Sequence, residues 1–148
     1  MVSTWTLRPG TPETVVHGDF RPDNFLLGRT TEAPPIAVVD CQTVHLGLGA
    51  CDVAYLIAGA FSPEERTAVE RELVAEYVDR LVAAGIDYDH DDGWRDFRWG
   101  TLHGVLIAVL ATMMAEQTER GDDMLTLMAV RHATHALDLQ ALDLIRGR

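Results

Sequence analysis

The chain has 148 residues, of which 47% are hydrophobic, and this is enough for one globular domain with its own core. Its formal net charge of -11 argues against a nucleic-acid or anionic-membrane surface, because binding to phosphates generally needs clustered positive charge. All 12 basic residues are arginine, and the sequence contains no lysine. We therefore expect neither a nucleic acid nor a membrane as partner.

The cysteines and the hydropathy pattern bear on the cellular compartment. Cys41 and Cys51 favour a reducing cytoplasm over a disulfide framework, and neither has companions at the spacing of a zinc site. No basic region followed by an apolar run opens the sequence, so we expect no signal peptide. The longest apolar segment, Val105 to Ala115, is shorter than the ~20 residues that span a bilayer. These features predict a cytoplasmic protein.

Residues 1–40 predict two short strands and a hairpin around a polar loop. Residues 1–14 include two prolines and are expected to form an extended lead-in. A very short strand at Val15-Val16 then enters the loop, and residues 25–27 predict a strand that leaves it. After a turn-rich connection, the apolar run Ile36 to Val39 ends in Asp40. The last two strands are expected to pair and to bring Asn24 and Asp40 close together.

The remainder of the chain is predicted to be helical. Residues 51–60 favour a short buried helix, and Ser62, Pro63 and Glu65 form a capping-box start for a second helix that Gly85 ends. The acidic stretch Asp87 to Asp92 is expected to be a solvated loop that caps a helix from Trp94 to about Glu119. Residues 121–123 are expected to break the chain before a last helix, from about Met124 to Ile145.

Three oxygen-bearing side chains suggest metal and proton chemistry. Asp19, Asn24 and Asp40 lie at loop or strand ends, and hard oxygen ligands of this kind suit Mg²⁺, which completes its shell with water and substrate phosphates. A carboxylate that stays off the metal can accept a proton from an attacking hydroxyl. For each aspartate alone, capping a turn is the commoner role. The three together favour a site.

This set resembles a known catalytic core. His17-Gly18-Asp19, followed by Asn24 and by an apolar strand that ends in Asp40, resembles the aminoglycoside phosphotransferase and choline kinase-like families, which share the protein-kinase fold. The resemblance implies that Asp19 orients or deprotonates the acceptor hydroxyl and that Asn24 and Asp40 bind Mg²⁺. The implied reaction transfers a phosphoryl group from ATP to the hydroxyl of a small molecule.

The resemblance also assigns supporting residues. His17 matches the structural histidine of the catalytic loop, and Leu26 matches the apolar residue on the floor of the adenine pocket. The segment Gly47 to Tyr55 resembles the family's Gly-rich turn and helix start, in which Asp52 braces the catalytic loop. The implied fold is a mostly helical α+β domain, the C-terminal lobe of a kinase-like phosphotransferase with one small β-hairpin and about four helices. Within this single domain, residues 15–40 are the catalytic loop and metal-binding hairpin, and residues 51–148 are the helical subdomain.

The sequence departs from the family pattern on its nucleotide side. Only about fourteen residues precede the catalytic loop, Pro9 and Pro12 lie where a preceding helix would end, and the lysine that holds ATP phosphates has no counterpart. Cys41 stands where relatives often carry an aromatic residue. We expect that the N-terminal lobe is missing and that the chain alone binds Mg-ATP weakly and is a poor or inactive enzyme. We also expect an uncovered apolar face, and hence a homodimer or a partner that covers it.

The acceptor site is expected between the catalytic loop and the C-terminal helices. An acidic rim there would favour a cationic acceptor, whereas a solvated acidic surface is the competing interpretation. The tryptophans fit the core as readily as a pocket. The candidate acceptor-contacting residues are Asp23, Asp89 to Asp92, Trp94, Arg98, Trp99 and His103.

Two other functional classes stay open at this stage. A metal-dependent phosphohydrolase would use His17, Asp19, Asp40 and His45 as a ligand cluster that activates water. A non-catalytic binding module is favoured by the absence of lysine. A Walker-type nucleotide site is excluded, because no Gly-rich loop with Lys and Ser or Thr precedes the run into Asp40.

Overall fold

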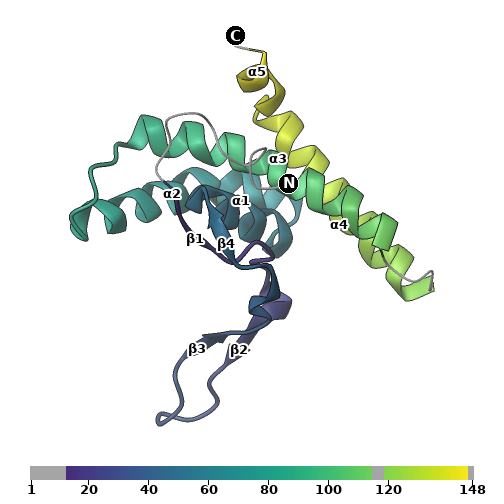
Figure 1. Ribbon diagram of the computed structural model, residues 1–148, viewed down its shortest axis with the longest axis horizontal. Coiled ribbons are helices and arrows are strands. Elements are labelled where there is room, and N and C mark those ends of the chain that lie inside the picture. Colours follow the sequence, from purple (N-terminus) through teal and green to yellow (C-terminus); the bar gives the residue numbers. More distant parts are fainter. Residues whose placement is uncertain (1–12, 115–118, 147–148) are drawn as a thin grey trace.

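The computed structural model describes residues 13–114 and 119–146. Figure 1 shows a group of packed helices from which a β-hairpin projects to one side. The mostly helical α+β architecture is the one that the sequence predicts. The expected lead-in over residues 1–14 lies almost wholly outside the described residues, and the first strand, β1, spans Thr14–Val16.

Four short strands form two separate antiparallel pairs within the described residues. Strands β2 (Phe25–Leu27) and β3 (Ile36–Val38) pair with Leu26 opposite Ala37, which confirms the predicted hairpin. Strand β1 pairs with β4 (His45–Gly47), which was not predicted. Two 3-10 turns, η1 (Pro22–Asn24) and η2 (Cys41–Thr43), lie next to these strands. The loop that carries Asp19 and the segment that carries Asp40 therefore each connect one strand pair to the other.

The first two helices agree with the predicted pattern. Helix α1 spans Gly49–Ala60 and α2 spans Pro63–Ala83. The capping box is present, because the Ser62 hydroxyl accepts from the Glu65 amide while the Glu65 carboxylate accepts from the Ser62 amide. Gly85 follows the end of α2 with a φ of 85°, a left-handed conformation that favours glycine.

The bounds of the later helices differ from the prediction. Helix α3 spans His90–Met114 and begins earlier than expected, because the Asp89 carboxylate caps the Asp92 amide at 2.7 Å. Helix α4 spans Glu119–Asp138, so the predicted break at residues 121–123 is wrong. The predicted single last helix is also wrong, since Gln140 has a φ of 51° and begins a separate α5 at Ala141–Ile145.

The core forms where α1 packs against the longer helices. Its central cluster joins α1 to α2 and α3 through Ala54, Ile57, Val74 and Phe97. Burial of this apolar surface is the main force that holds α1 in place. Trp94, a candidate acceptor contact, packs against the same cluster. Among the described helices, none has the length and apolar character needed to cross a bilayer.

Candidate active site

Helix α1 holds the polar loop between β1 and η1 through one carboxylate. Asp52, in the first turn of α1, accepts hydrogen bonds from the backbone amides of His17 at 2.6 Å and Gly18 at 3.0 Å. Two bonds to one ionised carboxylate fix both the position and the orientation of this peptide segment. These are the contacts that a bracing role for Asp52 requires.

Three more groups hold the same segment. The Thr43 hydroxyl donates to the carbonyl oxygen of His17 at 2.7 Å, and His103 Nε2 donates to that of Gly18 at 3.0 Å. The His17 ring donates through Nε2 to the carbonyl oxygen of Val39, at 3.0 Å. The loop is therefore tied to η2, α3 and the end of β3 at once.

Gly18 is required by the loop's backbone. Its φ is 82°, in the left-handed region, and a Cβ atom added there would lie 2.8 Å from the carbonyl oxygen of Thr43. A side chain would therefore be strained and would also push η2 away from the loop. The loop follows a path that only glycine allows at this point.

Asp19 and Asn24 are brought together by direct hydrogen bonds. The buried Asn24 amide nitrogen donates to the Asp19 backbone carbonyl at 2.8 Å and to the Asp19 carboxylate at 3.1 Å. Because the nitrogen is used in this way, the amide oxygen is the group left to meet a cation. The Arg21 guanidinium lies 3.5 Å from the same carboxylate of Asp19.

Asp40 follows β3 by two residues, next to the residue whose amide bonds Asn24. The Val39 amide donates to the Asn24 carbonyl at 2.9 Å, so the hairpin fixes the backbone of Asp40 close to that of Asn24. Asp40 itself is exposed and adopts φ 65° and ψ 54°. Left-handed residues other than glycine are uncommon, although Asp tolerates the conformation, and they cluster at functional sites.

The side chains near Asp19 fit a Mg²⁺ ion whose shell is completed by water and phosphate better than they fit a metal site made wholly of protein ligands. Asn24 and Asp40 supply an amide oxygen and a carboxylate, and Mg²⁺ usually takes one or two protein carboxylates plus water and phosphate oxygens. Within the described part of the chain, no three His, Cys, Asp or Glu side chains come together to hold a metal ion. His17 uses its ring on backbone groups, and His45 Nδ1 lies 2.9 Å from the Thr43 carbonyl oxygen. The ligand cluster of the phosphohydrolase alternative therefore does not form among these residues.

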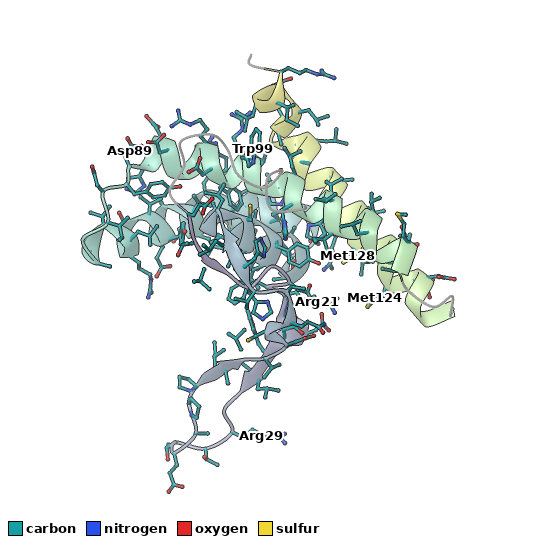
Figure 2. The ribbon with its side chains drawn as sticks, viewed as in Figure 1. Arg21, Arg29, Asp89, Trp99, Met124 and Met128 are labelled. Carbon is teal, nitrogen blue, oxygen red and sulfur yellow. The ribbon has the colours of Figure 1, made fainter. Side chains whose placement is uncertain are left out.

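A pocket of about 110 Å³ opens beside Arg21, between the loop, α1 and α4. Figure 2 shows Arg21 close to Met128 and Met124 of α4. The pocket contains Tyr55 of α1, whose pKa is raised by burial and by the charge of Asp19. Its other lining residues are Pro22, Asp23, Gly59, Leu127, Arg131 and His132.

Of the predicted acceptor contacts, Asp23 is the one that lines this pocket. His103 is buried and holds the Gly18 carbonyl, so it supports the loop from behind. Trp94 stacks on Phe97 and lies under the Arg71 guanidinium. Arg98 donates to the carbonyl oxygens of Leu139 and Gln140 where α4 gives way to α5. Asp89 lies at the start of α3, well away from Arg21 in Figure 2.

Leu26, the predicted adenine-floor residue, lies on the projecting hairpin. It is 58% exposed and is paired with Ala37 across β2 and β3. The hairpin therefore presents Leu26 to the outside of the helical body. Its contact with a nucleotide stays a prediction.

Sequence reasoning missed Thr43, Tyr55 and Arg131 as site residues. One signal was available for Tyr55, which follows Asp52 by three positions and so lies on the same face of α1. Thr43 and Arg131 are separated from the loop by 26 and about 110 residues, and only the folded chain brings them to it. A local sequence pattern therefore could not indicate either residue.

Comparison with known proteins identifies a family for the chain. No curated protein and no solved structure matches the chain significantly. Residues 4–98, more than half of the 148 residues, match the phosphotransferase enzyme family (APH). This range includes Asp19, Asn24, Asp40 and Asp52. The chain therefore belongs to the phosphotransferase enzyme family.

Proposed function

We propose that this chain carries the acceptor-side and metal-side groups of a site that transfers the γ-phosphoryl group of ATP to a hydroxyl group of a small molecule, with weak activity in the chain alone. Asp19 would act as the base, and Asn24 and Asp40 would bind Mg²⁺. The observation that carries the proposal is the pairing of Asp19 with Asn24 on a loop that Asp52 holds by two hydrogen bonds. Membership of the phosphotransferase family supports phosphoryl transfer as the class of reaction.

The arrangement gives each group one task in such a transfer. The Asp19 carboxylate accepts the proton of the acceptor hydroxyl as its oxygen bonds to the γ-phosphorus, and the bond between that phosphorus and the ADP oxygen breaks. Asn24 orients the carboxylate through its amide nitrogen. When bound, Mg²⁺ would neutralise negative charge on the phosphates.

Replacing Asp19 by Asn tests the assignment of the base. The variant keeps the shape of the side chain but cannot accept the proton, so phosphoryl transfer should fall by about a hundredfold or more. The measurement is ADP release and product formation at millimolar Mg-ATP, with thermal unfolding to show that the fold is kept. Asp79→Asn, on the exposed face of α2, is the matched control and should keep full activity. Undiminished transfer by Asp19→Asn would show that another group is the base.

The lysine-free composition predicts weak nucleotide binding. Arg21 is already paired with Asp19 and Asp23, so it is not a ready substitute for a phosphate-binding lysine. We expect isothermal titration of the 148-residue chain with Mg-ATP to give a Kd in the millimolar range or higher. A sub-millimolar Kd would contradict this. If the chain binds acceptors but transfers no phosphate, the second candidate, a binding module, describes it better.

A further inference from the structure

We infer that the acceptor is an uncharged or anionic hydroxyl compound with a small apolar body, and not a polycation. The inference rests on the proposed function, because it concerns the pocket next to Asp19. It follows from the side chains that form the walls of that pocket, which include Asp23 but none of the acidic residues 89–92 that the sequence suggested.

One wall of the pocket is apolar and belongs to a single helix face. Leu127 and Met128 follow Met124 by three and four residues, the spacing that places side chains on one face of α4. Figure 2 shows Met124 and Met128 on the side of α4 that faces Arg21. Leu127 is 52% exposed, so an apolar ligand would cover surface that water now contacts.

The charges in the pocket disfavour an ammonium group. Arg131 is held by a 2.6 Å hydrogen bond from Nη1 to the Gly59 carbonyl at the end of α1, and it forms no ion pair with a carboxylate in the described part of the chain. Asp23, the acidic residue of the lining, lies 4.0 Å from Arg21. The lining thus carries two arginines, Arg21 and Arg131, against the single carboxylate of Asp23, so a carboxylate or carbonyl group is favoured over an ammonium group.

The two buried rings of the pocket add no positive charge. Burial and the neighbouring histidines lower the pKa of His132 to about 4, so its imidazole is neutral at physiological pH. Tyr55 stacks on it with ring centroids 4.6 Å apart, and its hydroxyl donates to the sulfur of Met128 at 3.5 Å. The floor of the pocket is therefore an uncharged aromatic surface.

The size of the pocket argues against a large polycationic acceptor, and its position keeps the acidic residues 89–92 from contacting the acceptor. The pocket of about 110 Å³ is somewhat smaller than a cavity of about 150 Å³ that holds benzene, so it has room for no more than one ring or a short chain. Asp89 lies well away from Arg21 (Figure 2), and none of residues 89–92 lines the pocket. A multi-ring polycation would remain largely outside it.

Three probes with the same ring and the same hydroxyl group test this inference. They are meta-hydroxymethylbenzoate, which is anionic, meta-methylbenzyl alcohol, which is neutral, and meta-aminomethylbenzyl alcohol, which is cationic. Their Kd values are measured by NMR titration of the full chain without nucleotide, so the result does not depend on catalysis. We expect the anion and the neutral probe to bind, and the cation to bind about fivefold or more weakly than the anion.

Two variants connect the preference to the pocket. Arg131→Gln should remove the difference between anion and cation, and Arg80→Gln, a matched change on the exposed face of α2, should leave it unchanged. Tightest binding of the cation, an unchanged preference in Arg131→Gln, or no binding of any probe would overturn the inference. Phosphorylation of the probes by Mg-ATP is assayed separately. If the probes bind in the expected order of affinity but none is phosphorylated, the proposed function is rejected and the charge preference of the pocket stands.

Discussion

At the residue scale, Tyr55 connects the pocket to the support of the catalytic loop. Its ring stacks on His132 at an interplanar angle of 11° and meets the edge of His103 at 5.7 Å. His103 in turn donates to the Gly18 carbonyl. The three rings are buried, and burial lowers the pKa of both histidines. Their packing needs the neutral imidazole, which makes the fold sensitive to acid.

We predict that the free energy of unfolding falls as the pH drops below neutral, and that His132 contributes strongly. Its pKa is about 4 in the folded chain and 6.5 in the unfolded chain, so the unfolded state binds the proton first. The stabilisation is complete above pH 6.5 and is lost progressively towards pH 4. Between neutral pH and pH 5, the free energy of unfolding should fall by about 2 kcal/mol because of His132.

Urea unfolding of His132→Phe at both pH values checks this prediction. The phenyl ring keeps the stack on Tyr55 but cannot be protonated, so the loss of stability at pH 5 should shrink by about 2 kcal/mol. His90→Asn, which changes a histidine that is 60% exposed, should retain the pH dependence. An identical pH dependence in His132→Phe would assign the acid sensitivity to other groups.

At the element scale, glycines of α3 let two other helices approach closely. A Cβ atom on Gly100 would lie 2.7 Å from the Ala50 carbonyl of α1, and one on Gly104 would overlap the His132 ring of α4. Glycine inside a helix normally costs stability relative to alanine. Here it allows α3 to pack against α1 and α4 at the place where those helices carry the loop support and the pocket.

Gly100→Ala is predicted to destabilise the protein despite its better helix propensity. The propensity gain is about 1 kcal/mol, but forcing the added methyl group against the backbone of α1 should cost more, for a net loss of about 2 kcal/mol. Chemical unfolding measures the effect. Gly59→Ala is the control, because its Cβ atom would meet only ordinary contacts at 3.7 Å, and it should be neutral or stabilising. A stabilised Gly100→Ala would refute the close packing of α1 on α3.

At the scale of the whole molecule, the β2–β3 hairpin presents apolar side chains to the outside. Figure 1 shows it projecting from the helices, and Leu27 and Ile36, which face each other across the strands, are 70% and 54% exposed. Val38, two positions after Ile36, lies on the same face and adds to this surface, and Leu26 is exposed on the opposite face. Exposed apolar patches of this kind favour association, while the net charge of -11 opposes it.

We therefore predict that the chain self-associates and that salt strengthens the association, because salt screens the repulsion between like-charged copies. Light scattering coupled to size exclusion gives the mass at low and high ionic strength. Replacing both Leu27 and Ile36 by Thr keeps strand propensity and should shift the chain towards the monomer. Leu137→Gln, which removes an apolar side chain that is 67% exposed on α4, should not. A strictly monomeric parent chain at every salt concentration would contradict the prediction.

The elements that the sequence predicted well are those governed by neighbours in the chain. The capping box at Ser62, the left-handed Gly85 and the hairpin that ends before Asp40 depend on residues a few positions apart. The bounds of α4 were wrong because the exposed Asp122 and Asp123 lie near its N-terminus, where negative charge favours a helix. The break at Gln140 was missed because Arg98, 42 positions away, donates to its carbonyl oxygen.

The sequence by itself indicated the phosphotransferase family and the order of the chemical groups, because the spacing of His17, Asp19, Asn24 and Asp40 is a local pattern on one loop and one hairpin. It could not determine the pocket beside Arg21. Met128, Arg131 and Tyr55 come from two helices, and only the packing of α1 and α4 against the loop places them together. A pocket's charge depends on which distant side chains meet and which are already paired, and these are properties of the tertiary structure alone.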